Sequence, residues 1–196
     1  MKPAVFLDRD GTINEQMGYV NHISRFQLLP RTALAIRLLN EHGVPAVVVT
    51  NQSGLARGYF PLELLDEVHE KMLRELATAG AHIDGLYVCP HLPEAKVETF
   101  RKECDCRKPK PGLLLRASQE MGLDLQRSYV IGDRWSDLKT AARCQAKGVL
   151  VLTGYGRGDL QYIGPQEQVQ PHQIALDLYE AVQWVLHDLA GPKSLR

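Results

Sequence analysis

Val5-Phe6-Leu7-Asp8-Arg9-Asp10-Gly11-Thr12 carries the first strong structural signal of the chain. A short apolar run that proline precedes and glycine follows predicts a buried strand. Side chains alternate along a strand, so Asp8 and Asp10 should leave it on the same side. Two like charges on one side of a strand end need an explanation. They could bind a divalent cation together, or one carboxylate could act as nucleophile and the other as acid and base. A solvated acidic turn is the alternative that this stretch alone leaves open.

Hydrophobic periodicity extends this interpretation along the whole chain. It predicts further strands at 45–50, 84–89, 129–133 and 148–152, and helices at 30–42, 61–79, 112–121, 136–144 and 174–189. Strands that alternate with helices predict an α/β fold with a doubly wound parallel sheet. Ligands of such sheets bind beyond the carboxyl ends of the strands. Asp8, Thr50 and Asp133 all lie at predicted strand ends, so they converge if their strands are neighbours.

Composition narrows the class of protein. The chain has 196 residues, of which 44% are hydrophobic and 23% charged, and its formal net charge is zero. This length is typical of one globular domain, here expected over 1–196. Zero net charge argues against a nucleic-acid or membrane partner. With neither a signal peptide nor a run of about 18 apolar residues, we expect a cytoplasmic protein, monomeric by default.

The polar strand ends combine into one constellation. Asp8 and Asp10 supply carboxylates, Thr50 a hydroxyl, Lys108 a cation and Asp133 further anionic oxygen. Oxygen ligands without thiolate favour Mg²⁺, which we expect between Asp8, the carbonyl of Asp10 and Asp133, with Asp137 behind them. A hydroxyl, turn amides and a lysine suit phosphate oxygens. We therefore expect Asp8 to attack phosphorus and Asp10 to act as acid and base.

A second cluster lies in the irregular segment around 89–107. Cys89, His91, Cys104 and Cys106 form a Cys₃His set, which selects a structural Zn²⁺ that would clamp this long loop. Free thiols with a surface histidine remain an alternative, whereas a disulfide between Cys104 and Cys106 would strain so short a loop. Cys144 is expected to pack in the core.

These residues together resemble the haloacid dehalogenase (HAD) superfamily of phosphatases. Asp8 to Thr12 resembles its first motif, Thr50 its second, Lys108 its third, and Gly132-Asp133 with Asp137 its fourth. The intervals in which such proteins insert caps, 12–46 and 53–108, have no room for a cap domain here. The resemblance implies a HAD-like, capless core with an open site.

Within that superfamily the chain resembles the D-glycero-D-manno-heptose-1,7-bisphosphate 7-phosphatase family. The similar runs are Phe6 to Asn14, Thr50 to Gly58 and Cys104 to Pro109. The resemblance implies Mg²⁺-dependent release of the 7-phosphate from a sugar bisphosphate through an aspartyl-phosphate, on the route to ADP- or GDP-heptose for lipopolysaccharide. It also implies substrate contacts by ten residues: Arg9, Gln16, Met17, Gly18, Tyr19, Asn51, Gln52, Ser53, Arg107 and Arg134. Arg107 is the candidate for the distal 1-phosphate, while Arg134 departs from the lysine frequent in the family.

Three alternatives accompany this prediction. Histidinol-phosphate phosphatases, or other small sugar-phosphate phosphatases, form related HAD branches, but the stretch between His91 and Cys104 has the longer form of the heptose branch. A phospho-switch module is disfavoured by Asp10, which would drive dephosphorylation. A zinc-dependent binding domain with a dead site is disfavoured by the intact acidic set. The other histidines, His69 among them, are expected at helix ends or on polar faces.

Overall fold

The structure is a computed structural model that describes residues 1–191; residues 192–196 of the predicted domain lie outside it. Its six strands form one parallel sheet in the order β3-β2-β1-β4-β5-β6. The strands are β1 (Val5–Leu7), β2 (Ala46–Asn51), β3 (Gly85–Cys89), β4 (Tyr129–Gly132), β5 (Lys147–Val151) and β6 (Gln173–Ala175). The predicted doubly wound parallel sheet is confirmed.

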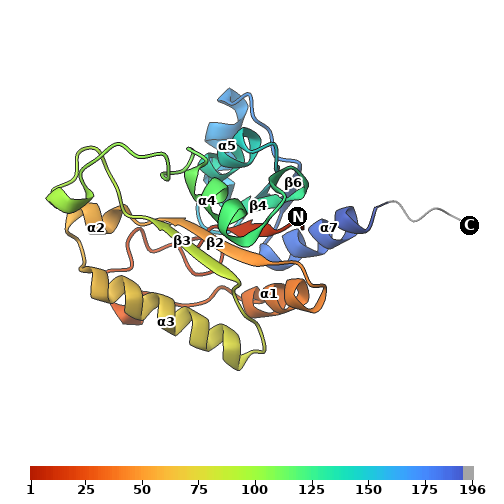
Figure 1. Ribbon diagram of the computed structural model, residues 1–196, viewed down its shortest axis with the longest axis horizontal. Coiled ribbons are helices and arrows are strands. Elements are labelled where there is room, and N and C mark those ends of the chain that lie inside the picture. The colour runs from red at the N-terminus through yellow and green to blue at the C-terminus, as the bar shows by residue number, and fades with distance from the viewer. Residues whose placement is uncertain (192–196) are drawn as a thin grey trace, which may run out of the picture.

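Helices cover both faces of this sheet (Figure 1). They are α1 (Thr32–Glu41), α2 (Ser53–Arg57), α3 (Leu62–Thr78), α4 (Gly112–Met121), α5 (Trp135–Arg143), α6 (Gly156–Gly158) and α7 (Leu178–Ala190). Helices α1, α3 and α7 pack on one face, and α4 and α5 pack on the other. Among the described residues no helix combines the length and apolarity needed to cross a membrane.

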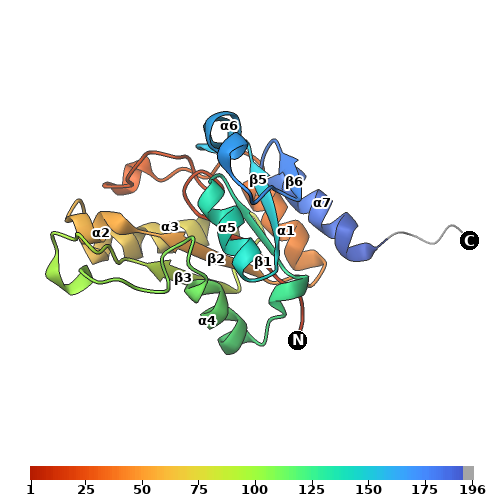
Figure 2. The same cartoon turned by 90° about the horizontal axis from the view of Figure 1, so that it is seen from above.

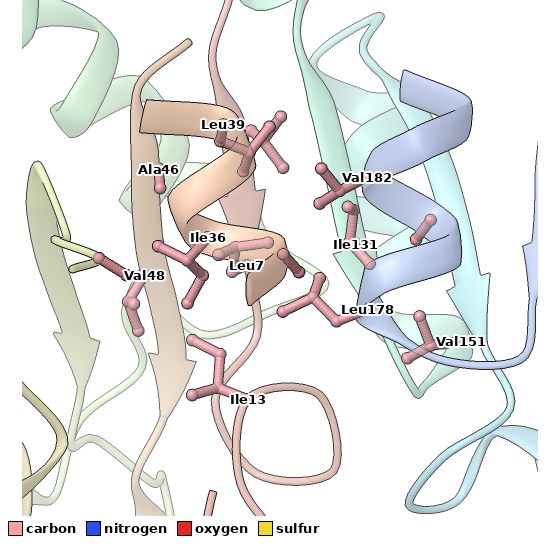
Figure 3. Close-up of a cluster of buried hydrophobic side chains, with 14 of the residues drawn as sticks. Leu7, Ile13, Ile36, Leu39, Ala46, Val48, Ile131, Val151, Leu178 and Val182 are labelled. Carbon is pink, nitrogen blue, oxygen red and sulfur yellow. The ribbon is translucent and has the colours of Figure 1, made fainter. Parts of the chain in front are cut away.

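Alternation along the central strand explains this three-layer core. Val5 and Leu7 pack into the cluster shared with α1 and α7, while Phe6 packs toward α4 on the opposite face. Figure 3 shows Leu7 among Ile36 of α1, Leu178 of α7 and the neighbouring strands. Because every one of these side chains is fully or almost fully buried, the sheet is a stable platform for the loops at its edge.

Strand order places the predicted polar ends together. Strand β1 pairs in parallel with β2 through Leu7 and Val48, and with β4 through Leu7 and Ile131. The chain winds outward in both directions from this point, which makes the carboxyl end of β1 the switch point. The expected convergence of Asp8, Thr50 and Asp133 follows from these neighbours.

The two intervals in which related proteins insert a cap, 12–46 and 53–108, contain only parts of this core and its loops. The first holds the short helix η1 (Ile23–Arg25) and α1, and the second holds α2, α3, β3 and η2 (Glu98–Phe100). Figure 2 shows the loop after β3 extending to the end of the molecule where α2 lies. Backbone amides of Lys96 and Val97 donate to the carbonyl of Ala56 in α2. Within residues 1–191 the core is capless, as expected.

The structure corrects three element predictions. Ile174 lies in β6 and not in the closing helix, which begins at Leu178 after the N-cap Asp177. Residues 53–57, where the sequence predicts no helix, form the short helix α2. The segment 154–171, where the sequence predicts neither helix nor strand, contains α6, the π-helix η4 (Asp159–Ile163) and the 3-10 helix η5 (Gly164–Gln166). The last two errors arise because short helices carry too few residues for a period to show.

Candidate active site

Three carboxylates meet beyond β1 and β4. One oxygen from each of Asp8, Asp133 and Asp137 lies within 4.8 Å of the others. Asp133 Oδ2 accepts the backbone N–H of Tyr155 at 2.8 Å, but Asp133 Oδ1 is buried without a hydrogen-bond partner among the described residues. An unpaired buried carboxylate oxygen is costly unless a cation binds it, and hard cations prefer such oxygens. These residues therefore fit the Mg²⁺ that the sequence predicts.

Two glycines allow Asp133 to approach the turn after β1. A Cβ atom at Gly11 or at Gly154 would lie 2.1 Å from Asp133 Oδ2. Both glycines also have positive φ, at 88° and 52°, where other residues are strained. The glycine in the acidic motif is thus required by the close approach of the Asp133 carboxylate.

Asp137 is held by protein atoms, which agrees with a place behind the ion. Its Oδ1 pairs with Lys108 Nζ at 2.6 Å, and its Oδ2 accepts the N–H of Arg134 at 3.2 Å. It lies in the first turn of α5 and is fully buried. Both oxygens of Asp137 therefore have protein partners, in contrast to Asp133, whose Oδ1 has none among the described residues.

Lys108 connects Asp137 to the predicted nucleophile. Its Nζ lies 2.9 Å from Asp8 Oδ1 and its side chain is 2% exposed. Burial alone would lower the pKa of Lys108, but Asp137 and Asp8 outweigh burial and raise it, so the cation is permanent. Asn51 holds the lysine backbone by donating to its carbonyl at 3.1 Å and accepting its N–H at 3.0 Å. The lysine is thus fixed for binding a phosphate oxygen beside Asp8.

Asp10 points away from the carboxylate cluster. Its Oδ2 accepts bonds from Arg9 Nη2 at 2.8 Å and from Gln52 Nε2 at 2.7 Å, and its Oδ1 accepts from Asn14 Nδ2 at 2.9 Å. Burial would raise the pKa of Asp10, but Arg9 and these hydrogen bonds lower it. Gln52 also donates to Thr50 Oγ1 at 2.9 Å, which links the acid/base candidate to the hydroxyl that is predicted to bind phosphate.

A cavity of about 580 Å³ opens above these groups. Its lining includes twelve predicted site residues: Asp8, Asp10, Gln16, Gly18, Tyr19, Thr50, Asn51, Gln52, Ser53, Arg107, Lys108 and Arg134. Two other predicted contacts, Arg9 and Met17, do not line it. Arg9 is 1% exposed and turned inward, whereas Met17 uses its carbonyl to accept a bond from Arg25 Nη2. Substrate contact by these two residues stays a prediction.

Several lining residues were missed in the sequence. Arg57, Lys139 and Tyr155 belong to the cavity wall. The guanidinium of Arg134 stacks at 4.5 Å on the ring of Tyr155, a geometry that a lysine would not reproduce. Arg57 lies in the run Thr50 to Gly58 that carried the resemblance, and its buried Nε lacks a hydrogen-bond partner among the described residues. Asp159 and Ile163 also line the cavity and lie in the π-helix η4. This segment is too short to show a helical period of apolar residues in the sequence.

The Cys₃His set is brought together as predicted. Cys89 Sγ lies 3.2 Å from Cys106 Sγ and 3.6 Å from Cys104 Sγ, and His91 Nδ1 lies 3.2 Å from Cys106 Sγ. Ligand atoms of a tetrahedral zinc site lie about 3.5–3.8 Å apart, as bond lengths near 2.3 Å require. The four cysteines of the chain are free thiols. This cluster therefore fits Zn²⁺, with Nδ1 as the histidine ligand.

Crowding of the carboxylates predicts how pH acts on the metal-free protein. Burial, followed by neighbouring carboxylates, raises the pKa of Asp8 to about 6 and that of Asp133 to about 8. A carboxyl whose pKa rises on folding stabilises the protein at low pH and loses that contribution as pH increases. We expect the unfolding temperature in chelator to fall from about pH 4 to about pH 8, and Mg²⁺ to raise it more at pH 8 than at pH 5. Thermal denaturation across pH checks this, and a magnesium shift equal at both values would contradict it.

Comparisons with known proteins agree with this geometry. The HAD-hydrolase-like family model matches residues 105–181. The chain is 40% identical to the D-glycero-beta-D-manno-heptose-1,7-bisphosphate 7-phosphatase of Yersinia pestis over 99% of this chain and 95% of that protein. It is 41% identical to the enzyme of the same name from Escherichia coli strain K12, over 99% and 94%.

A solved structure extends the comparison to three dimensions. The D,D-heptose 1,7-bisphosphate phosphatase from B. bronchiseptica, complexed with magnesium and phosphate, superposes with a TM-score of 0.84. The two proteins are 34% identical, and the match covers 96% of this chain and 99% of that one.

Proposed function

The chain belongs to the D-glycero-beta-D-manno-heptose-1,7-bisphosphate 7-phosphatase family of HAD-like hydrolases, and we propose that it releases the 7-phosphate of that bisphosphate with Mg²⁺. The observation that carries this proposal is the pairing of Asp8 with buried Lys108 on the floor of a cavity whose walls carry Arg57, Arg107 and Arg134. The floor suits the phosphate that reacts. The additional guanidinium groups suit a second phosphate on the same substrate.

In the proposed reaction an oxygen of Asp8 attacks phosphorus and forms an aspartyl-phosphate. Asp10 gives a proton to the leaving 7-oxygen and then takes one from the water that cleaves the acyl-phosphate. The Asp10 pKa is lowered by Arg9, which suits the base role, and an arriving phosphate anion raises that pKa toward the acid role. Thr50 and Lys108 bind the equatorial oxygens, where transition-state charge collects.

The metal contributes charge to this arrangement. Asp8, the carbonyl of Asp10 and Asp133 would hold Mg²⁺, which lowers the repulsion between a carboxylate nucleophile and a phosphate anion. The magnesium and phosphate in the related structure support this choice of ion. The free Oδ1 of Asp133 supports its position.

Substrate comparison tests the proposal against its nearest alternative. Initial rates of phosphate release should give a higher kcat/KM for heptose 1,7-bisphosphate than for histidinol phosphate. Faster turnover of histidinol phosphate would reassign the chain to that HAD branch. Equal, weak turnover of both would indicate another small sugar phosphate as the substrate.

We also propose that Zn²⁺ bound by the Cys₃His set clamps the loop that presents Arg107 and Lys108. Cys104→Ser should remove zinc from the purified protein and lower its unfolding temperature, because the loop then loses its closing metal. Cys144→Ala is the matched control, because Cys144 is buried in the same apolar cluster but is not part of the Cys₃His group, so its loss should leave zinc content unchanged. Zinc measured by atomic absorption at equal amounts in Cys104→Ser and the parent would contradict the assignment.

The remaining parts of the proposal concern the cell. We place the reaction in the cytoplasm, where the product would serve as precursor of ADP- or GDP-heptose for lipopolysaccharide. The occupant of the site is a small-molecule sugar bisphosphate, and a monomer carries the complete set of proposed site residues within one chain. Zero net charge supports the absence of a nucleic-acid partner.

A further inference from the structure

A buried arginine lies directly behind the acid/base candidate. Arg9 is 1% exposed, and its guanidinium bonds to Asp10 through Nη2 at 2.9 Å to Oδ1 and 2.8 Å to Oδ2. Nε is a longer donor to Oδ1, at 3.3 Å. The arginine therefore fixes both oxygens of Asp10, and its own orientation determines where that carboxylate lies.

The third nitrogen of this guanidinium meets a histidine from another layer of the fold. Arg9 Nη1 lies 3.1 Å from Nε2 of His69, sixty residues later in the chain and on α3. His69 is 8% exposed, so this contact is shielded from solvent. Since guanidinium nitrogens only donate, His69 Nε2 must accept, which requires the neutral imidazole with its proton on Nδ1. Burial and then Arg9 lower the pKa of His69 to about 4, which agrees with that neutral form.

The position of His69 on α3 argues for a specific role. The other buried residues of this helix are apolar: Leu65, Val68, Met72 and Leu76. An apolar side chain would have satisfied packing at residue 69, but would have left a buried guanidinium N–H unpaired. A carboxylate there would have competed with Asp10 for Arg9. A neutral acceptor pairs with the remaining guanidinium nitrogen of Arg9 and leaves the positive charge of Arg9 paired with Asp10.

We propose that His69 is a positioning residue that acts through Arg9 to aim Asp10 at the leaving group and the hydrolytic water. The proposal rests on the acid/base role given to Asp10 in the proposed function. It also gives Arg9 a task that its burial allows, in place of direct contact with substrate. The expected result of losing His69 is impaired proton transfer with substrate binding retained.

Two substitutions of His69, whose new side chains have similar length, distinguish this positioning role from a role in packing. His69→Gln retains an acceptor oxygen, whereas His69→Met fills similar space without one, and both residues are good helix formers. The substrates are p-nitrophenyl phosphate and phenyl phosphate, which differ in how strongly the leaving oxygen needs a proton. Values of kcat/KM report the first step, transfer of the phosphoryl group to Asp8. Thermal unfolding of each variant accompanies the kinetics.

We expect His69→Met to lose about tenfold in kcat/KM with phenyl phosphate, as part of the contribution of general acid catalysis, but little with p-nitrophenyl phosphate. KM should change little, and His69→Gln should restore the parent ratio between the two substrates. An equal loss on both substrates, no loss in His69→Met, or no rescue by His69→Gln would each overturn the proposal. Aryl phosphates make the test independent of the sugar, so failure on heptose bisphosphate would count against the proposed function alone.

Discussion

Replacing Asp8 by asparagine is expected to reduce phosphate release by roughly 10⁴-fold or more, as loss of a nucleophile does in other covalent enzymes. An amide oxygen is a poor nucleophile, and the acyl-phosphate that Asp8 forms has no counterpart on asparagine. The variant retains the shape of the side chain and the acceptor for the backbone N–H of Arg9, which now lies 2.7 Å from Asp8 Oδ1. The fold should therefore persist.

Stability provides the control for this variant. Burial raises the pKa of Asp8 to about 6, which means that ionising Asp8 costs more free energy in the metal-free fold than in the unfolded chain. We expect the unfolding temperature of Asp8→Asn in chelator to equal or exceed that of the parent. Residual turnover of about one thousandth to one hundredth of the parent rate would instead show that Asp8 acts electrostatically, because such effects are typically 10²–10³-fold.

Replacing Lys108 by glutamine should have the largest effect on stability. The change leaves Asp8 and Asp137 buried with no cation between them, and removal of one partner from a buried ion pair typically costs about 3–5 kcal/mol. It also removes the donor that binds transition-state charge, for which we expect a loss of about 10²–10³-fold in kcat. Urea unfolding in chelator measures the first effect and phosphate release the second.

Lys110→Gln is the matched control for this experiment, because Lys110 is exposed two residues away in the same loop. It should alter neither quantity by more than surface substitutions usually do, about 0.5 kcal/mol. Magnesium should recover part of the stability lost in Lys108→Gln, since a cation beside the same carboxylates partly replaces the lysine. Equal stability of the two variants in chelator would contradict the role of Lys108 as the counter-charge.

The sequence was sufficient for the features that depend on local pattern. Asp8 and Asp133 ended strongly apolar runs, and parallel topology turned these ends into one site. The Cys₃His spacing was equally readable, because two close pairs of ligands flank one loop. Strand β6 was missed because it has only three residues at the sheet edge, where Gln173 is half-buried, Ile174 is exposed and the run is too short to show alternation.

The sequence could not predict the roles of residues that depend on packing between the layers of the fold. For Arg9 the family resemblance implied a substrate contact, whereas its side chain is buried and lies against His69 of α3. The expectation that His69 lies at a helix end or on a polar face was wrong: it is 8% exposed, and the approach of α3 to the turn after β1 gives it Arg9 as a partner. Arg57 was readable as part of the resembling run, but its exposure to the cavity depends on the short helix α2.

The most direct measurement of the central claim is the identity of the product. Phosphorus NMR of heptose 1,7-bisphosphate incubated with the Mg²⁺-loaded protein distinguishes a sugar that keeps its anomeric phosphate from one that keeps its 7-phosphate. We predict accumulation of heptose 1-phosphate with one equivalent of inorganic phosphate, and no release by Asp8→Asn. Accumulation of heptose 7-phosphate, or no release by the folded, metal-loaded parent, would contradict the account.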